Sequence, residues 1–244
     1  MIEVVLIDSS KNPLKDMYIA YRNCYSKESI IRVSNDIDSG KITDDDMKRY
    51  LSKSLMGNHI SPTYQTIFNF AIEHISRSCT AQANRSKVGA EKTEMSGRYV
   101  DLRDRTAFVT PPSFKRFNVI DKWAKLQQHM IEFYDICIKQ GIPKEDARFG
   151  LGLGLESRLS YSFSFEALRK FISERTCYRA QWEIRKVANK MKIQMKKEHP
   201  FLAGYLGKAC DSCNGGICYE SEADYYDCKA AKKCLNIHLI EDKK

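Results

Sequence analysis

The 244-residue sequence lacks the features that would place it in a membrane or outside the cell. No apolar run approaches the ~20 residues that a membrane-spanning helix needs. The opening segment, Met-Ile-Glu-Val-Val-Leu-Ile-Asp, has no basic stretch before its short apolar run, so it predicts a strand and not a signal peptide. These absences argue against a secreted or integral membrane protein, and we expect a cytoplasmic one.

The chain also lacks internal repeats, low-complexity tracts, long linkers and any recognised nucleic-acid motif. Its composition, 43% hydrophobic and 29% charged, is typical of a folded chain with a packed core. Lys and Arg number 40 against 31 Asp and Glu, which gives a net charge of +9. That balance favours an anionic partner such as a nucleotide or a phosphorylated cofactor. Nucleic acid is disfavoured because no aromatic-interleaved basic stripe accompanies the charge.

Cysteine is too sparse for a disulfide scaffold, with nine residues in 244. Four cysteines lie within apolar patterns and predict buried free thiols in a reducing compartment: Cys24, Cys79, Cys137 and Cys177. The other five crowd into the end of the chain as Cys210-x2-Cys213-x4-Cys218-x9-Cys228-x5-Cys234.

This tail has one feature of a zinc site, because Cys-x2-Cys gives the chelate that tetrahedral zinc prefers. The candidate ligands are Cys210, Cys213, Cys218 and Cys228. The remaining spacing matches no standard zinc module. Reduced thiols, a disulfide-linked tail and, less favoured, an iron–sulfur cluster stay open as alternatives.

Hydrophobic periodicity predicts an α+β fold, and we expect it to contain a mixed sheet and long helices. We expect an α+β domain over residues 1–205 and a cysteine-rich extension over 206–244. Thr43, followed by three aspartates, predicts a helix start, and Pro200 predicts the end of the last helix. The strands are expected at 2–8, 64–73 and 156–165, and the helices at 13–24, 43–56, 75–86, 118–140, 144–151 and 166–197, the last with a break near 174–177.

Two short segments combine cations with hydrogen-bonding groups. Arg85 and Lys87 follow a predicted helix, and Gln82 lies one turn before Arg85 on the same face. Ser96-Gly97-Arg98 offers a hydroxyl, an unhindered backbone N–H and a guanidinium, which together suit a phosphate. Any one of these residues could be an ordinary solvated surface group. Their clustering favours a binding site.

These segments, Gln82-x-x-Arg85-x-Lys87 and then Glu94-x-Ser96-x-Arg98-Tyr99, resemble the signature of the flavin-dependent thymidylate synthases. The fingerprint of that family is Arg-His-Arg, several residues, and Ser-x-Arg. Three further stretches are similar to family motifs: His59-Ile-Ser61-Pro62 before Phe68-Asn-Phe70, Asp146-Ala-Arg148 before Glu156-Ser-Arg158, and Arg179-Ala-Gln-Trp-Glu-Ile-Arg185. The order agrees over about residues 1–210, and four motifs in order indicate the family's fold.

The resemblance implies an α+β subunit of a homotetramer whose active sites lie between subunits. It also implies FAD as cofactor and a methyltransferase activity in dTMP biosynthesis. In that family, reduced flavin drives transfer of a one-carbon unit from methylenetetrahydrofolate to C5 of dUMP, and NADPH reloads the flavin. No enzyme nucleophile attacks the base, so a catalytic cysteine is not required.

The resemblance also implies roles for individual residues. The nucleotide set is Gln82, Arg85, Glu94, Ser96, Gly97, Arg98, Arg158 and Arg185, in which Arg85, Ser96 and Arg98 take the phosphate. Arg158 and Arg185 would face the base and stabilise developing charge, which makes them the catalytic candidates. The cofactor set is His59, Ser61, Ser86, Lys87, Tyr99, Arg175 and Arg179. Within it, His59 and Tyr99 match positions near the folate or nicotinamide stacking site.

Departures from the family pattern concentrate on the flavin positions. Arg85-Ser86-Lys87 replaces Arg-His-Arg, and Lys cannot reproduce bidentate contacts to a pyrophosphate. Ser164-Phe165-Glu166 replaces Asn-Ala-Arg and reverses a charge, and Ser173-Glu174-Arg175 keeps only the Arg of Asn-x-Arg. Three functions therefore stay open: methylation of dUMP, another C5 modification of a pyrimidine nucleotide such as hydroxymethylation, and a non-catalytic module that binds nucleotide or nucleic acid.

Overall fold

A computed structural model describes residues 1–57, 59–103, 107–177 and 180–207. The expected α+β class is confirmed. The strands are β1 (Glu3–Ser9), β2 (Ile67–Ser76), β3 (Ala90–Glu94) and β4 (Glu156–Ser164). The helices are α1 (Pro13–Tyr25), α2 (Ile30–Asp38), α3 (Asp44–Ser54), α4 (Arg77–Ala83), α5 (Pro112–Arg116), α6 (Ile120–Lys139), α7 (Lys144–Ala147), α8 (Phe165–Arg175), α9 (Trp182–Glu198) and α10 (Pro200–Ala203), with short 3₁₀ segments η1 (Ser61–Gln65) and η3 (Arg148–Gly150).

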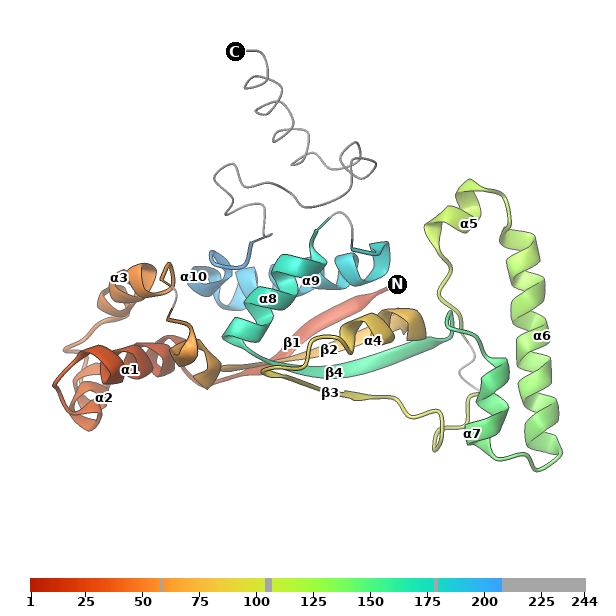
Figure 1. The fold of residues 1–244 in the computed structure, drawn as a ribbon, viewed down its shortest axis with the longest axis horizontal. Coiled ribbons are helices and arrows are strands. Elements are labelled where there is room, and N and C mark those ends of the chain that lie inside the picture. Colours follow the sequence, from red (N-terminus) through yellow and green to blue (C-terminus); the bar gives the residue numbers. More distant parts are fainter. Residues whose placement is uncertain (58, 104–106, 178–179, 208–244) are drawn as a thin grey trace, which may run out of the picture.

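The strands form one sheet in the order β1-β2-β4-β3, and every described pairing in it is antiparallel. The expected mixed sheet was therefore wrong in this detail. The segments that connect the strands form helices at the ends of the sheet and over one face (Figure 1). Each described strand runs opposite to its neighbour in the sheet. Helices α4, α8 and α9 all pack on that one face.

The core lies between this covered face and the three helices. Alternate residues of β4, Leu159, Tyr161 and Phe163, are buried there, while Arg158 and Ser160, on either side of Leu159, are exposed on the opposite face. The Tyr161 and Phe163 rings contact Phe171 of α8. Strand alternation thus assigns every β4 side chain to one face or the other.

Two groups of helices extend from opposite ends of the sheet (Figure 1). Helices α1 to α3 lie at one end, and α5 to α7 lie at the other, where a second small core forms around Leu102, Tyr134 and Leu155. The predicted Thr43 cap is confirmed as a capping box with Asp46. None of the helices in the described part of the chain is long and apolar enough to cross a membrane.

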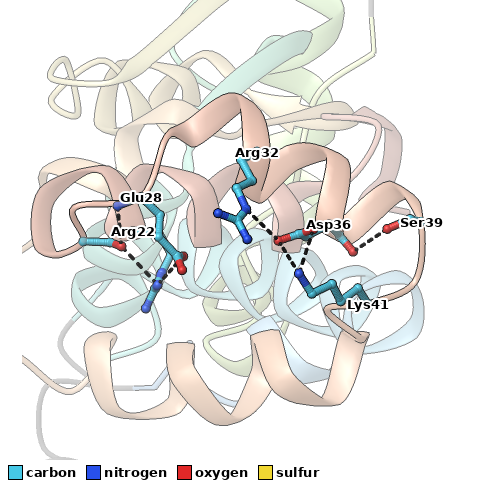
Figure 2. Close-up of polar contacts among 7 residues, drawn as sticks. Arg22, Glu28, Arg32, Asp36, Ser39 and Lys41 are labelled. Carbon is cyan, nitrogen blue, oxygen red and sulfur yellow. Dashed lines mark hydrogen bonds and ion pairs between the residues drawn. The ribbon is translucent and has the colours of Figure 1, made fainter.

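Surface ion pairs lie on the first two helices and the segments that follow them (Figure 2). Asp36 on α2 accepts from Lys41 at 3.3 Å and lies 4.0 Å from Arg32. Arg22 on α1 contacts Glu28 at 2.9 Å. Exposed pairs of this kind contribute about 0–1 kcal/mol each, so the apolar packing beneath them holds this group of helices together.

A buried carboxylate anchors α9 to the junction of β2 and α4. Gln181 caps α9 by accepting from the backbone N–H groups of Glu183 at 2.8 Å and Ile184 at 3.3 Å. Glu183 is 1% exposed, and it accepts from the Ser76 backbone N–H at 2.6 Å and hydroxyl at 2.5 Å. Both carboxylate oxygens are therefore satisfied, as a buried charge requires.

Several element boundaries differ from the expected ones. The strand expected at 64–73 begins at Ile67 because Ser61–Gln65 forms a 3₁₀ turn, and it continues to Ser76, so the following helix is shorter than 75–86. The segment expected as a helix over 144–151 divides into α7 and η3. Pro200 follows the end of α9 as expected, but it also begins α10 from the first helical turn, which tolerates proline.

The scattered cysteines follow the prediction only in part. All four are free, and Cys79 and Cys137 are buried. Cys24 is exposed and Cys177 is partly exposed, so the expected burial was wrong for these two. Cys24 follows Ala20 and Tyr21 at helical spacing, but it lies in the last turn of α1, where the side chains are exposed. Burial raises the pKa of the Cys79 thiol, which keeps it protonated and unreactive.

Candidate active site

The loop that follows β3, residues 95–101, is here called the Ser96 loop. Its backbone turns around Ser96, whose carbonyl accepts from the N–H groups of Tyr99 at 3.3 Å and Val100 at 3.0 Å. The Ser96 hydroxyl accepts from the Arg98 N–H at 3.3 Å. The predicted Ser96-Gly97-Arg98 group therefore forms one compact turn, directly after Glu94.

Cations from α7 and η3 surround this loop. Arg98 pairs with Glu145 at 2.6 Å, and Lys144 donates to the Tyr99 carbonyl at 3.4 Å. A Cβ on Gly97 would lie 3.3 Å from Cδ of Arg148, so glycine permits the arginine to pack closely on the loop. Glu145 pairs with Arg98 and Asp101 lies 4.0 Å from Lys144, so the three cations are partly balanced by two carboxylates beside the turn.

Lys144 and Arg148 were not among the predicted site residues. Both are distant in sequence from the Ser96 loop, and only the fold brings them to it. A usable signal was present in the Asp146-Ala-Arg148 stretch, which was noted as a family motif without a role for its arginine.

Glu94 is held by two donors within the chain. Arg77 donates to its Oε1 atom at 2.7 Å, and the Ser157 hydroxyl donates to the same oxygen at 3.1 Å. The other terminal nitrogen of Arg77 donates to the Met95 carbonyl at 2.8 Å. The predicted substrate ligand Glu94 is thus fixed before any substrate arrives.

The turn between α4 and β3, residues 84–89, carries the predicted Arg85-Ser86-Lys87 group. Arg85 and Lys87 are exposed and form no ion pair with the described residues. Gly89 has a φ of +68°, and a Cβ there would lie 2.5 Å from the Ser164 hydroxyl oxygen. This turn therefore exposes two cations to solvent, while its backbone at Gly89 packs closely on Ser164.

Arg175 contributes a third cation to this end of the molecule. Its side chain is 18% exposed, and its Nε atom is buried with no hydrogen-bond partner among the described residues. Tyr161 donates to the Ser86 carbonyl at 3.3 Å and to the Ala83 carbonyl at 2.9 Å. Burial raises the pKa of Tyr161 to about 12, against the opposing effects of the Ser86 hydrogen bond and the Arg175 charge. Arg175 therefore lies near this turn, with a buried Nε atom that lacks an acceptor among the described residues and a terminal nitrogen 3.9 Å from Glu174.

The reversed charge at Glu166 is balanced inside the chain. Its carboxylate accepts from Arg169 at 3.1 Å, one helical turn later, and from the buried Thr63 hydroxyl at 3.4 Å. Ser164, at the other changed position nearby, caps α8 by accepting from the Ala167 N–H at 3.3 Å. The substitution therefore removes a cation without leaving an unpaired carboxylate.

His59 and Ser61, both of the predicted cofactor set, lie within hydrogen-bonding distance of each other. The Nε2 atom of His59 lies 2.7 Å from the Ser61 hydroxyl, and its Nδ1 atom lies 2.8 Å from the Tyr25 hydroxyl. Tyr21 donates to the His59 carbonyl at 2.9 Å. Tyr25, which was not predicted, thus completes a hydrogen-bonded Tyr–His–Ser chain at the surface.

The predicted phosphate ligands separate into two groups within one chain. β3 pairs with β4 from Ala90 opposite Phe163 to Glu94 opposite Leu159. The turn bearing Arg85 precedes β3 and the Ser96 loop follows it, so the two are separated by a strand length on the order of 14 Å. Arg85 is therefore not brought to Ser96 and Arg98 by this chain alone.

The two expected catalytic arginines are also separated. Arg158 is exposed on the uncovered face of β4, because its neighbours Ser157 and Leu159 face the core. Arg185 is on α9, which packs on the covered face. Gln82 lies on α4 on the same side as α9, and its side chain donates to the Ser78 carbonyl at 3.4 Å. The sheet itself therefore stands between Arg158 and Arg185.

Some predicted residues fall outside the described part of the chain. They are Arg179 of the cofactor set and the cysteines of the tail, Cys210, Cys213, Cys218 and Cys228. Within residues 1–57, 59–103, 107–177 and 180–207, no group of three or more His, Cys, Asp or Glu side chains could hold a metal ion. Tyr99 is within those ranges, and its ring is exposed beside the Arg98 guanidinium.

Comparison with a solved structure supports the fold. The chain resembles a UMP/dUMP methylase PolB from Streptomyces cacaoi bound with 5-Br dUMP, with a TM-score of 0.65. The match has 20% sequence identity and covers 84% of this chain and 94% of the other.

Comparisons of sequence find relatives of higher identity than this solved structure. The family described as thymidylate synthase complementing protein matches residues 5–201. The flavin-dependent thymidylate synthase of Pyrococcus abyssi is 34% identical over 91% of this chain and 91% of its own length. The enzyme of the same name from Clostridium tetani is 29% identical over 98% of this chain and 97% of its own. By these matches and the motifs in their folded positions, the chain belongs to the thymidylate synthase complementing protein family, that of the flavin-dependent thymidylate synthases.

Proposed function

We propose that the protein methylates C5 of dUMP to give dTMP, with FAD as cofactor, methylenetetrahydrofolate as one-carbon donor and NADPH as reductant. The observation that carries this proposal is the Ser96 loop, a compact turn of hydroxyl and backbone donors bordered by Arg98, Lys144 and Arg148. Such a site suits the dianionic phosphate of a nucleoside monophosphate. The relatives' shared name supplies the reaction.

In this proposal the chain's residues orient the nucleotide. Ser96, the Gly97 N–H and Arg98 hold the phosphate, and the fixed carboxylate of Glu94 offers an acceptor to the sugar or base. Gln82 and Arg85 complete the nucleotide set. Arg158 and Arg185 donate to the base carbonyls and stabilise negative charge as it develops on the ring.

The separation of these groups supports the homotetramer that the family resemblance implies. One chain leaves Arg85 about a strand length from the Ser96 loop and places Arg158 and Arg185 on opposite sides of the sheet. A site that uses all of them needs side chains from more than one subunit. We therefore propose that the nucleotide binds between subunits.

The residues present fit an anionic cofactor at the 84–89 turn. Arg85 and Lys87 are exposed there, and the buried Nε of Arg175 has no partner among the described residues. Lys87 and Arg175, with Ser86 and Arg179, would hold the FAD phosphates, while His59, Ser61 and Tyr99 border the ring systems of flavin, folate or nicotinamide. Bound flavin supplies the reducing equivalents that complete the methyl group.

The test begins with the absorbance spectrum of the purified protein after FAD is added and excess is removed. We expect retained flavin and, with all substrates, tritium release from [5-³H]dUMP together with dTMP. Tritium release with a different C5 product would favour the alternative suggested by Ser86 and Lys87, such as hydroxymethylation. Binding of dUMP without flavin or tritium release would overturn the enzymatic proposal and favour a nucleotide-binding module.

We also propose that residues 206–244 form an extension of the 1–205 domain and that the cysteines of this extension bind zinc. Elemental analysis of the purified chain should give one zinc per subunit. Substituting Cys210 and Cys213 by serine should remove it while leaving the thermal transition of the main domain in place. A metal-free chain with reactive thiols would contradict this.

A further inference from the structure

Arg77 lies where two parts of the proposed nucleotide site meet. It is the first residue of α4, the helix that carries Gln82, and its side chain reaches the end of β3. One terminal nitrogen donates to Glu94 at 2.7 Å and the other to the Met95 carbonyl at 2.8 Å. A Cβ on Gly97 would lie 3.6 Å from the second of these nitrogens, so the guanidinium packs under the Ser96 loop.

The backbone from which the Arg77 side chain extends is held by several hydrogen bonds. Ser76, immediately before Arg77, caps α4 by accepting from the Cys79 N–H at 3.0 Å, and it donates to the buried Glu183 carboxylate. The Arg77 N–H itself donates to the Leu155 carbonyl at 2.9 Å. Arg77 therefore extends from a backbone that is fixed on both sides.

The chemistry of the contact indicates positioning and not direct anion binding. Both terminal nitrogens of Arg77 already donate to acceptors of this chain, and its charge is neutralised by Glu94. The side chain is only 24% exposed. The planar fork of arginine suits two acceptors that lie side by side, one a carboxylate and one a carbonyl, and lysine cannot reproduce this arrangement.

We propose that Arg77 is a positioning residue that fixes Glu94 and the Ser96 loop in the geometry that binds the nucleotide phosphate. The contact restrains the first residue of the loop through Met95 and the last residue of β3 through Glu94. This inference rests on the proposed function for its catalytic consequence, but the restraint on the loop can be measured without substrate.

The kinetic test compares Arg77→Ala, Arg77→Lys and Arg32→Ala, the last a control in an exposed pair on α2 (Figure 2). Losing a charge-assisted hydrogen bond of this kind predicts a rise in KM for dUMP of about tenfold in Arg77→Ala, with kcat nearly unchanged. Arg77→Lys should lose about threefold because it keeps one contact. Arg32→Ala should match the unmodified protein. An unchanged KM in Arg77→Ala overturns the proposal.

The substrate-free test is amide hydrogen exchange of the peptide covering residues 95–101. We expect faster exchange in Arg77→Ala and no change in Arg32→Ala, with the other core peptides protected as before. Equal exchange in this segment overturns the proposal whether or not dUMP binds. If the unmodified protein fails to bind dUMP while the exchange difference is found, the proposed function fails and the positioning of the loop stands.

A double-mutant cycle separates positioning from general destabilisation. If Arg77 acts through Glu94, the effect of Arg77→Ala on exchange of the Ser96 loop should be smaller in a Glu94→Gln background than alone. Additive effects would mean that Arg77 acts independently of Glu94, and would overturn the proposed linkage.

Discussion

At the end of β3 that carries Glu94, the chain holds its own cations in place, whereas at the end that begins with Ala90 it leaves them exposed. Around the Ser96 loop, Arg98 is paired with Glu145 and Arg77 with Glu94. Around the 84–89 turn, Arg85 and Lys87 lack ion pairs with the described residues.

This difference follows the pattern of retained and altered residues. The ordered end contains the residues that agree with the family signature, and the open end contains the changed Ser86 and Lys87. A preorganised site loses little conformational entropy when its ligand binds, because its side chains are already ordered. In the proposed function a cofactor or a neighbouring subunit gives the exposed cations of the open end a partner, so changes of Arg85 or Lys87 should alter binding without disturbing the fold.

The largest expected effect comes from removing a cation at the ordered end. Arg98→Ala should weaken dUMP binding about 100-fold, because a charge-assisted phosphate contact contributes about 1.5–3 kcal/mol. Calorimetric titration with dUMP would measure the loss of affinity in Arg98→Ala. The control variant Arg32→Ala should bind dUMP as the unmodified chain does. Equal affinities would show that the phosphate binds elsewhere.

A second change breaks the packing of the open end. Gly89→Ala should lower the free energy of unfolding by about 2–3 kcal/mol, because the new Cβ meets the Ser164 hydroxyl at 2.5 Å and the backbone is left-handed. Gly40→Ala is the matched control, with a φ of +77° and open space, and should cost about 1 kcal/mol. Urea unfolding compares the two, and an equal loss would mean that only the backbone angle matters.

A third change sharpens the comparison by restoring a lost donor. Lys87→Arg should tighten FAD binding about fivefold, since a planar fork can contact two phosphate oxygens at once. Lys53→Arg on α3, outside the proposed cofactor set, should leave FAD binding unchanged. Flavin fluorescence titration measures both. No gain at Lys87 would show that this side chain does not reach the cofactor.

The smallest effect concerns Tyr161, beneath the 84–89 turn. Its pKa is raised from 10.0 to about 12, so the unfolded chain releases this proton first as the pH rises. Its contribution to stability is complete below pH 10 and is lost as the pH rises towards 12. Tyr161→Phe should therefore lose less stability between about pH 9 and about pH 11 than the unmodified chain does. Parallel urea profiles would contradict this.

Local signals predicted much of the fold. The Thr43 capping box and the alternation of β4 are encoded within a few residues, and both were confirmed. β3 was missed because Ala-Glu-Lys-Thr-Glu has little apolar alternation, and it is a strand only through its pairing with β4. An edge strand with one partner needs few buried side chains, which leaves a weak pattern in the sequence.

The candidate site was predictable in its residue types but not in its arrangement. Arg148 and Lys144 reach the Ser96 loop from another part of the chain, and no spacing rule connects them. Arg158 and Arg185 were paired by chemistry, yet strand alternation and the placement of α9 put the sheet between them. Motifs identify which side chains matter, and tertiary structure decides which of them meet.

The Glu183 anchor also bears on how the chain assembles during synthesis. It joins residues 107 positions apart, and its helix α9 covers the strand β1 at the beginning of the chain. Until α9 leaves the ribosome, the apolar side chains of Ile2 and Val4 lack the cover of that helix and are exposed to other chains. Packing of α9 is thus a late step of folding, so truncations before Trp182 should aggregate rather than yield a smaller folded protein.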